Sequence, residues 1–187
     1  MTGEPLPDPA LVVLVGASGS GKSTWANARY RSAEVVSSDH LRGVLGSGPA
    51  DLDASADAFA VLDLVVAARV RRGLTVVVDT LGLDAARRAG WLALARASGL
   101  PAVAVVLEAD PATCRRRNAG RDRPVPARVL DTQLRQAATV ADELAAEGWD
   151  HVVRVDTSAP ATDPAPGPRP VVAPPSTPRR LPLVLQL

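Results

Sequence analysis

Residues 16–24 stand between a short apolar run, residues 11–15, and a stretch with helical character, residues 22–31. In order they are Gly16, Ala17, Ser18, Gly19, Ser20, Gly21, Lys22, Ser23 and Thr24. The spacing Gly-x-x-x-x-Gly-Lys-Ser is that of a phosphate-binding loop, which needs a strand before it and a helix after it. Both are present, so the segment predicts a nucleotide site. The alternative interpretation is a chance Gly/Ser turn.

The chemistry of this loop follows from its residue types. Its three glycines allow positive φ, so backbone N–H groups can curl around an anion, and the following helix adds its positive N-terminal end. Lys22 would reach the β- and γ-phosphates of ATP, and the Ser23 hydroxyl would bind Mg²⁺. Lys22 is also the single lysine among 21 basic residues, at a point where a compact ammonium suits phosphates better than a planar guanidinium.

Composition bounds the class of protein. A chain of 187 residues predicts one domain, and 47% hydrophobic with 22% charged residues is typical of a globular protein. Aromatic residues make up only 3%, so the core must be built from Ala, Val and Leu. The net charge of +1 provides no global field for nucleic acid or membrane, so any polyanion site must be a local patch.

Localisation is predicted from what the sequence lacks. Cys114 is the sole cysteine, which excludes an intrachain disulfide and fits a reducing compartment, and we interpret it as a small core residue. The first nine residues have no basic segment typical of a signal peptide. No apolar run approaches the roughly 20 residues that span a bilayer. We therefore expect a cytoplasmic protein with no membrane partner.

Strand and helix patterns alternate along the chain. Strands are predicted at 11–15, 34–37, 74–79, 102–107 and 152–155, and helices at 22–31, 53–72, 84–98, from 110 until Gly120 interrupts, and about 127–147. This alternation predicts an α/β fold. We expect the three-layer α/β/α sandwich of a P-loop NTPase, with a mostly parallel five-stranded sheet and a small helical lid at about 110–126.

The ends of the chain differ from its middle. Residues 1–9 are interpreted as a flexible leader and residues 10–157 as the P-loop domain. Residues 158–187 are rich in proline, which predicts a disordered tail with polyproline II character. Its apolar end, 181–187, would dock on the domain, bind a protein partner or remain mobile.

Three further residues are candidates for chemistry at the carboxyl ends of the strands. In open parallel sheets, ligands bind at this rim, which would place Asp39 beside the phosphate-binding loop. Asp39 is the candidate general base, and Arg42 could hold a phosphate of the acceptor. The alternative is a helix cap at Ser38 or Asp39 with a solvated arginine. Asp79 would bind Mg²⁺ through water or contact the acceptor, or else cap the next turn with Thr80.

A basic cluster lies in the predicted lid. It contains Arg115, Arg116, Arg117, Arg121 and Arg123. Arg117 and Arg121 would share a helix face if the helix continued through Gly120. Two guanidiniums over a triphosphate would offset the charge that develops during phosphoryl transfer, and a hinge at Gly120 would suit a closing lid. The alternative is a solvated basic face.

With these motifs placed, residues 11–155 resemble the kinase domain of 5′-hydroxyl polynucleotide kinases of phage and bacteria. The resemblance is carried by Gly19-Ser20-Gly21-Lys22-Ser23-Thr24-Trp25-Ala26, by Ser37-Ser38-Asp39-His40-Leu41-Arg42-Gly43 and by Arg117-Asn118-Ala119-Gly120-Arg121, with Arg123 just after. It implies that Asp39 is the base and that Arg42 grips the acceptor 3′-phosphate. It also implies that Lys22, Arg117 and Arg121 hold the ATP phosphates and that Ser23 binds Mg²⁺. The sequence departs from the family after Asp79-Thr80, where Leu81-Gly82 replaces the usual nearby Asn.

Three hypotheses follow. The first is an ATP-dependent kinase that phosphorylates the 5′-OH end of DNA or RNA. The second is a small-molecule kinase of the same fold, with a sugar, nucleoside or antibiotic hydroxyl as acceptor. The near-neutral charge and scarcity of aromatic residues favour it, since single-strand binders usually have basic grooves and stacking rings. The third is a non-catalytic nucleotide-binding adaptor that presents its proline-rich tail to a protein partner.

Overall fold

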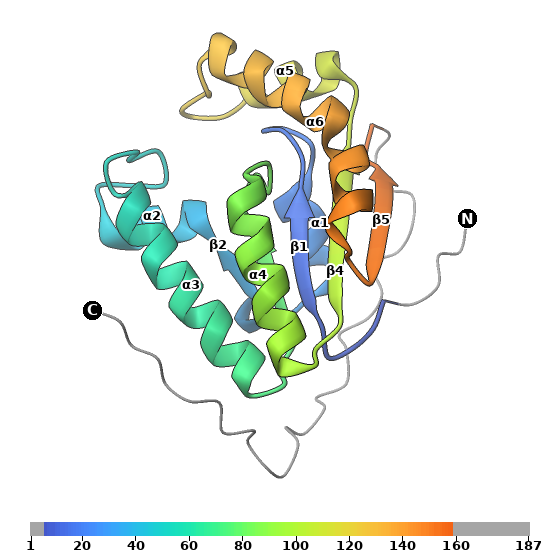
Figure 1. Ribbon diagram of the computed structural model, residues 1–187. Helices are drawn as coiled ribbons and strands as arrows, with labels where there is room; N and C mark the ends of the chain where they lie inside the picture. Colours follow the sequence, from blue (N-terminus) through green and yellow to red (C-terminus); the bar gives the residue numbers. More distant parts are fainter. Residues whose placement is uncertain (1–5, 159–187) are drawn as a thin grey trace.

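The computed structural model describes residues 6–158. At its centre is a five-stranded parallel sheet (Figure 1). Its strands are β1 (Leu11–Val15), β2 (Val35–Ser37), β3 (Val76–Asp79), β4 (Ala102–Glu108) and β5 (His151–Asp156). The strand order is β2-β3-β1-β4-β5, and every pair of neighbours is parallel. All five strands predicted from the sequence are therefore present.

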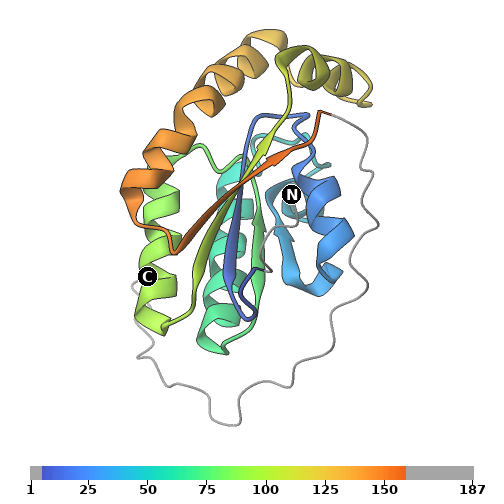
Figure 2. The ribbon, with the colours of Figure 1, turned by 90° about the vertical axis from the view of Figure 1, so that its right-hand side faces the viewer.

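Helices cover both faces of this sheet. They are α1 (Lys22–Arg29), α2 (Ser38–Leu45), α3 (Ser55–Arg71), α4 (Ala85–Ser98), α5 (Pro111–Ala119) and α6 (Ala127–Glu147), with a short 3₁₀ turn η1 (Ser32–Glu34). Helices α3, α4 and α6 pack on one face and α1 packs on the other (Figure 2). The predicted three-layer α/β/α sandwich is confirmed.

The central strand shows why a continuous apolar run is required. All five residues of β1 are fully buried, and their side chains alternate between two cores. Leu11, Val13 and Val15 face α3, α4 and α6, whereas Val12 and Leu14 face α1. A strand buried on both faces has no polar side to present to solvent. Strands β3 and β4 lie on opposite sides of β1. The loop after β1 therefore opens at the point where the strand order of the sheet reverses.

The boundaries of some elements differ from the prediction. Helix α6 begins and ends as expected, between Pro126 and Gly148, while α3 is shorter than predicted by a few residues. The cap of α2 is Ser37, whose Oγ accepts a hydrogen bond from His40 N at 3.4 Å, so the alternative of a cap at Ser38 or Asp39 is wrong. Helix α5 ends before Gly120, so Arg117 and Arg121 do not share one helix.

Both chain ends were assigned roles that the structure addresses only in part. Of the predicted leader, residues 6–9 lie against the domain: Leu6 packs on the core beside α1, and the Thr75 hydroxyl donates to the Asp8 carboxylate. Residues 1–5 and 159–187 lie outside the described residues, including the apolar end at 181–187. No helix within residues 6–158 is both long and apolar enough to cross a membrane.

One buried arginine joins α4 to α6. Arg88 is fully buried, and its guanidinium donates to both carboxylate oxygens of Glu147, to Glu143 at 2.7 Å and to the Gly82 carbonyl at 2.8 Å. A buried charge is tolerated only when paired and hydrogen-bonded, which these groups achieve. Gly82 follows β3, so Arg88 ties the turn after that strand to α6.

We predict that Arg88→Ala lowers the free energy of unfolding by about 3 kcal/mol, because it leaves the buried Gly82 carbonyl without its partner and the Glu147 carboxylate with only Trp149. Urea unfolding followed by circular dichroism measures the change. Arg96→Ala is the matched control on α4, since Arg96 is exposed and its only described bonds are to the carbonyls of Glu147 and Gly148. Equal losses in the two variants would contradict this account.

Candidate active site

The loop between β1 and α1 forms a cradle of backbone groups. Gly16, Gly19 and Gly21 have φ of 154°, 83° and 87°, a region that side chains disfavour. Space excludes larger residues as well. A Cβ atom on Gly16 would lie 2.6 Å from the Leu107 carbonyl oxygen, and one on Gly19 would lie 2.6 Å from that of Cys114. The loop therefore fits the backbone curl that an anion-binding cradle requires.

Lys22 begins α1 and turns back over this loop. Its Nζ donates to the carbonyl oxygens of Gly16 and Ala17, both at 2.8 Å. Burial lowers the pKa of Lys22 to about 8, and the positive charge of Arg121 adds to this effect, while Asp79 and Asp39 oppose it. The ammonium is thus held by two loop carbonyls, and the charges of Asp79 and Asp39 favour its protonated form.

A hydrogen bond connects α1 to the end of β3. Ser23 Oγ donates to Asp79 Oδ2 at 2.8 Å. Burial raises the pKa of the Asp79 carboxyl, and the bond from Ser23 and the charge of Lys22 oppose this rise. The alternative role of Asp79 was to cap the next turn together with Thr80. Of the two, Thr80 closes that turn, because its Oγ1 accepts a hydrogen bond from Gly82 N at 3.1 Å. A hydroxyl and a carboxylate side by side are oxygen ligands that Mg²⁺ accepts.

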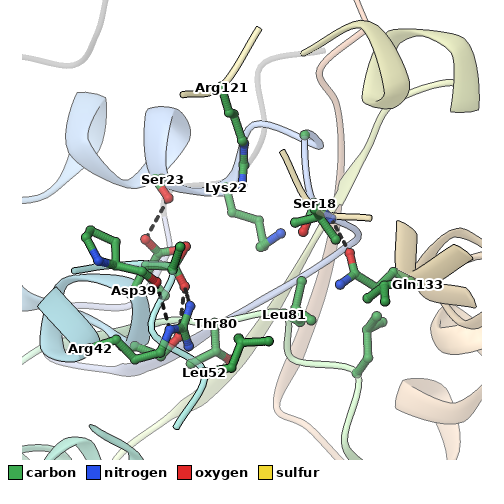
Figure 3. Close-up of a pocket in the computed structure, with 18 of the residues that line it drawn as sticks. Ser18, Lys22, Ser23, Asp39, Arg42, Leu52, Thr80, Leu81, Arg121 and Gln133 are labelled. Atoms are coloured by element: carbon green, nitrogen blue, oxygen red, sulfur yellow. Dashed lines mark hydrogen bonds and ion pairs between the residues drawn. The ribbon is translucent and has the colours of Figure 1, made fainter. Parts of the chain in front are cut away.

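Asp39 and Arg42 lie on α2 across the cleft from Lys22 (Figure 3). They form an ion pair, and Arg42 Nε also donates to the Pro49 carbonyl at 2.9 Å. The Asp39 side chain is 60% exposed, whereas that of Arg42 is 14% exposed. Arg42 is therefore held by two partners within the cleft wall, in contrast to the alternative of a solvated arginine.

The predicted lid arginines separate into two groups. Arg117 donates to the carbonyls of Gly19 at 3.3 Å and Thr157 at 2.7 Å, so it fastens α5 to the loop. Arg121 is exposed and extends toward Lys22 (Figure 3). Arg123 lines the same cleft. Two hydrogen bonds between Asn118 and the backbone of Val125 close the segment that carries Arg121 and Arg123.

Two residues at the loop were not predicted from the sequence. Gln133 on α6 accepts a hydrogen bond from Ser18 N at 3.0 Å, and Thr157 Oγ1 donates to the Ser20 carbonyl at 2.7 Å. The position of Gln133 in the helical pattern could have identified it from the sequence. It is a buried polar residue on the face of α6 that also carries Leu130 and Val140, where the helical period would place an apolar side chain.

Cys114 lies against the same loop but offers no chemistry there. Its thiol is buried, and burial raises the pKa of that thiol, so the reactive thiolate is disfavoured. This agrees with its interpretation as a small core residue.

The cleft has a volume of about 1320 Å³ and continues beyond the loop. The far wall consists mainly of apolar side chains, with one arginine among them. These residues are Leu52, Phe59, Leu81, Leu83, Arg87 and Trp91. The Arg87 guanidinium lies 3.7 Å from the centre of the Phe59 ring, a cation–π contact. The cleft thus joins a phosphate-binding half to a half that could hold a second molecule.

Comparison with protein families now adds to this geometry. A family model described as an AAA domain matches residues 11–156. The chain belongs to this AAA domain family. The match includes the whole sheet and every helix from α1 to α6. A search of curated proteins gives no match.

Solved structures resemble this AAA domain in fold. A Chaetomium thermophilum Kti12 in complex with ADP-AlF3 is 17% identical, with a TM-score of 0.57 over 79% of this chain and 89% of that one. A Sinorhizobium meliloti gluconokinase is 23% identical, with a TM-score of 0.52 over 81% and 85%. An Acinetobacter baumannii shikimate kinase is 18% identical, with a TM-score of 0.50 over 81% and 87%. The fold of the AAA domain is therefore that of P-loop kinases.

We predict that the affinity of the loop for ATP falls above about pH 8, by up to about tenfold per pH unit, because the lowered pKa means that Lys22 loses its proton there. Below this pH the ammonium is present in the free protein, and binding requires no proton uptake. Calorimetric titrations from pH 7 to 9.5 measure the profile. Lys22→Arg should bind more weakly with a flat profile, since a guanidinium stays charged. A parallel decline in both proteins would contradict the assignment.

Proposed function

We propose that the protein is an ATP- and Mg²⁺-dependent phosphotransferase. One observation carries the proposal: the Asp39 carboxylate faces the same cleft as Lys22 and the Ser23–Asp79 pair. A nucleotide-binding adaptor needs the loop and the lysine, but it has no use for a carboxylate across the cleft from them. A kinase needs that carboxylate to accept the proton of the attacking hydroxyl.

The residues of the loop have distinct roles in this proposal. Backbone N–H groups between Gly16 and Thr24 would bind the phosphates, apart from those of Gly16, Ser18 and Ser20, which donate within the protein, and Lys22 would pair with the outer two phosphates. Ser23 would ligate Mg²⁺ directly and Asp79 would ligate it directly or through water, which assigns Asp79 to the metal rather than to the acceptor. ATP supplies the phosphoryl group, and Mg²⁺ neutralises charge on its oxygens.

Asp39 would act on the acceptor. As the acceptor oxygen bonds to the γ-phosphorus and the bond from that phosphorus to ADP breaks, the hydroxyl proton passes to the Asp39 carboxylate. Arg42, paired with Asp39, holds the carboxylate in place. Arg121 extends toward Lys22 from the lid and would offset the charge of the transferring group, with Arg123 beside it and Arg117 holding the lid on the loop.

For the acceptor we propose a 5′-OH polynucleotide end, DNA or RNA. The proposal is supported by the resemblance of residues 37–43 to the segment that carries the base in polynucleotide kinases. It is also supported by Arg42, which is anchored beside Asp39 where an acceptor phosphate would lie next to the reacting hydroxyl. Arg87, which is paired with Asp63 and Asp84, also lines the cleft.

A small-molecule hydroxyl is the second candidate acceptor, and it too has support. The net charge is only +1, and the far wall is largely apolar, with the Leu52 side chain 74% exposed. A long polyanion usually requires a continuous basic track. Two solved structures of the same fold are named gluconokinase and shikimate kinase, which act on small molecules with hydroxyl groups.

A panel of acceptors with labelled ATP discriminates between these functions. Transfer to 5′-OH oligonucleotides and not to 5′-phosphorylated controls supports the first acceptor, and transfer to sugars, nucleosides or other metabolites supports the second. Nucleotide binding with no transfer to any acceptor would overturn the kinase assignment and favour the adaptor. That hypothesis can then be tested by deleting residues 160–187 and measuring the loss of a bound protein partner.

We predict that Asp39→Asn lowers the transfer rate by about 10²–10⁴-fold while ATP affinity changes less than threefold, since an amide cannot accept the proton. Single-turnover transfer of labelled phosphate and calorimetric titration with ATP measure the two effects. Asp57→Asn on α3 is the matched control, because Asp57 is exposed and lies outside the cleft. Normal transfer by Asp39→Asn would show that another group is the base.

A further inference from the structure

Gln133 contacts the phosphate-binding loop from outside the loop sequence. The Ser18 backbone N–H donates to Gln133 Oε1 at 3.0 Å, and the Gln133 residue is 8% exposed. An N–H group can only donate, so this bond fixes which end of the amide is oxygen and which is nitrogen. Among the residues that the structure describes, Gln133 Nε2 has no hydrogen-bond partner, and Gln133 lines the same cleft as Ser18 and Lys22 (Figure 3).

The position of Ser18 indicates which phosphate Gln133 would meet. The N-terminus of α1 begins at Lys22, so its N–H groups would hold the inner phosphates. Lys22 Nζ instead reaches back to the carbonyls of Gly16 and Ala17, the two residues before Ser18. The outermost phosphate, which pairs with Nζ, would therefore lie next to Ser18 and to the amide of Gln133.

Helix α6 holds Gln133 firmly at this point. The helix follows the lid segment directly, and Leu130 and Val140 on the same face are buried in the domain. At its C-terminal end, Glu143 and Glu147 bind Arg88, which also binds the carbonyl of Gly82 after β3. A side chain on a helix anchored at both ends keeps its direction, which a donor needs if it is to discriminate between ligands.

We propose that Gln133 recognises the γ-phosphate of ATP. Its Oε1 orients the loop by accepting a hydrogen bond from Ser18 N–H, and its Nε2 donates a hydrogen bond to a γ-phosphate oxygen. The inference rests on the proposed function in that the ligand is ATP. It goes beyond that function by assigning the distinction between ATP and ADP to one amide on the helix after the lid. Binding of ATP would then engage α6 as well as the loop, whereas ADP would engage the loop alone.

The test compares ATP and ADP affinities of three variants with those of the full-length protein. Gln133→Glu keeps an oxygen for Ser18 N–H but has no amide donor, and Gln133→Ala removes both groups. We expect Gln133→Glu to weaken binding of the β,γ-imido analogue of ATP at least tenfold and ADP less than twofold, as measured by calorimetry. Gln133→Ala should weaken the analogue about tenfold with a smaller loss for ADP.

Ala138→Glu is the control, since it adds the same charge further along α6 at an exposed position outside the cleft. Its ATP-to-ADP affinity ratio should stay within twofold of the unmodified protein. Equal losses of ATP and ADP affinity in both Gln133 variants, no loss in either, or the same effect in Ala138→Glu would overturn the proposal.

The outcomes for Gln133 and for the kinase assignment are separable. If the unmodified protein transfers phosphate to an acceptor while the Gln133 variants retain the normal affinity ratio, only the role of Gln133 fails. If the Gln133 variants lose discrimination while no acceptor is ever phosphorylated, the γ-phosphate contact stands and the kinase assignment fails. If neither ATP nor ADP binds, both fail together.

Discussion

A buried ammonium is costly, and much of the site is arranged to hold one. Burial lowers the pKa of Lys22, which measures how strongly the site disfavours the charge when no anion is bound. Two loop carbonyls bind the Nζ atom, and the carboxylate of Asp79 compensates part of the charge. A triphosphate would satisfy the same ammonium more completely. Within the described residues, the charge of Lys22 is therefore only partly compensated.

This constraint extends outward through three contacts that hold the loop. Ser23 joins its helix to β3 through Asp79, Gln133 joins Ser18 to α6, and Arg117 joins Gly19 to the lid and to Thr157 after β5. Each contact comes from a different part of the chain. The loop is consequently fixed from several sides before any ligand arrives, which reduces the reorganisation that binding would require.

The sequence predicted the fold well because its signals are local. Pro126 and Gly148 mark both ends of α6, and the uninterrupted apolar runs identify strands buried on both faces. The candidate site was predicted as a set of residues on one rim, and Lys22, Asp39 and Asp79 do line one cleft. Their roles in binding and catalysis stay predictions.

The partners within the site could not be predicted, because they depend on sheet order and on the direction of single side chains. The Ser23–Asp79 bond joins residues that are 56 apart in sequence, and it requires β3 to lie beside β1. The burial and pairing of Arg88 could not be predicted, because arginine is rarely fully buried. Nothing near Arg88 in the sequence indicates that its partners are two glutamates more than 50 residues away. The pairing of Arg117 with Arg121 assumed a helix through Gly120, whereas α5 ends there, with Arg117 bonded to the loop and Arg121 exposed.

That separation has a mechanical consequence for the lid. Arg117 already uses its guanidinium on the carbonyls of Gly19 and Thr157, so α5 is fastened to the loop at its base. Beyond Gly120, the segment with Arg121 is exposed, and the two Asn118–Val125 bonds return it to the domain. Closure over a ligand would then be confined to the few residues between Gly120 and Pro124 rather than involve the whole helix. A closure of that size would leave α6, and the Gln133 amide that it carries, in place.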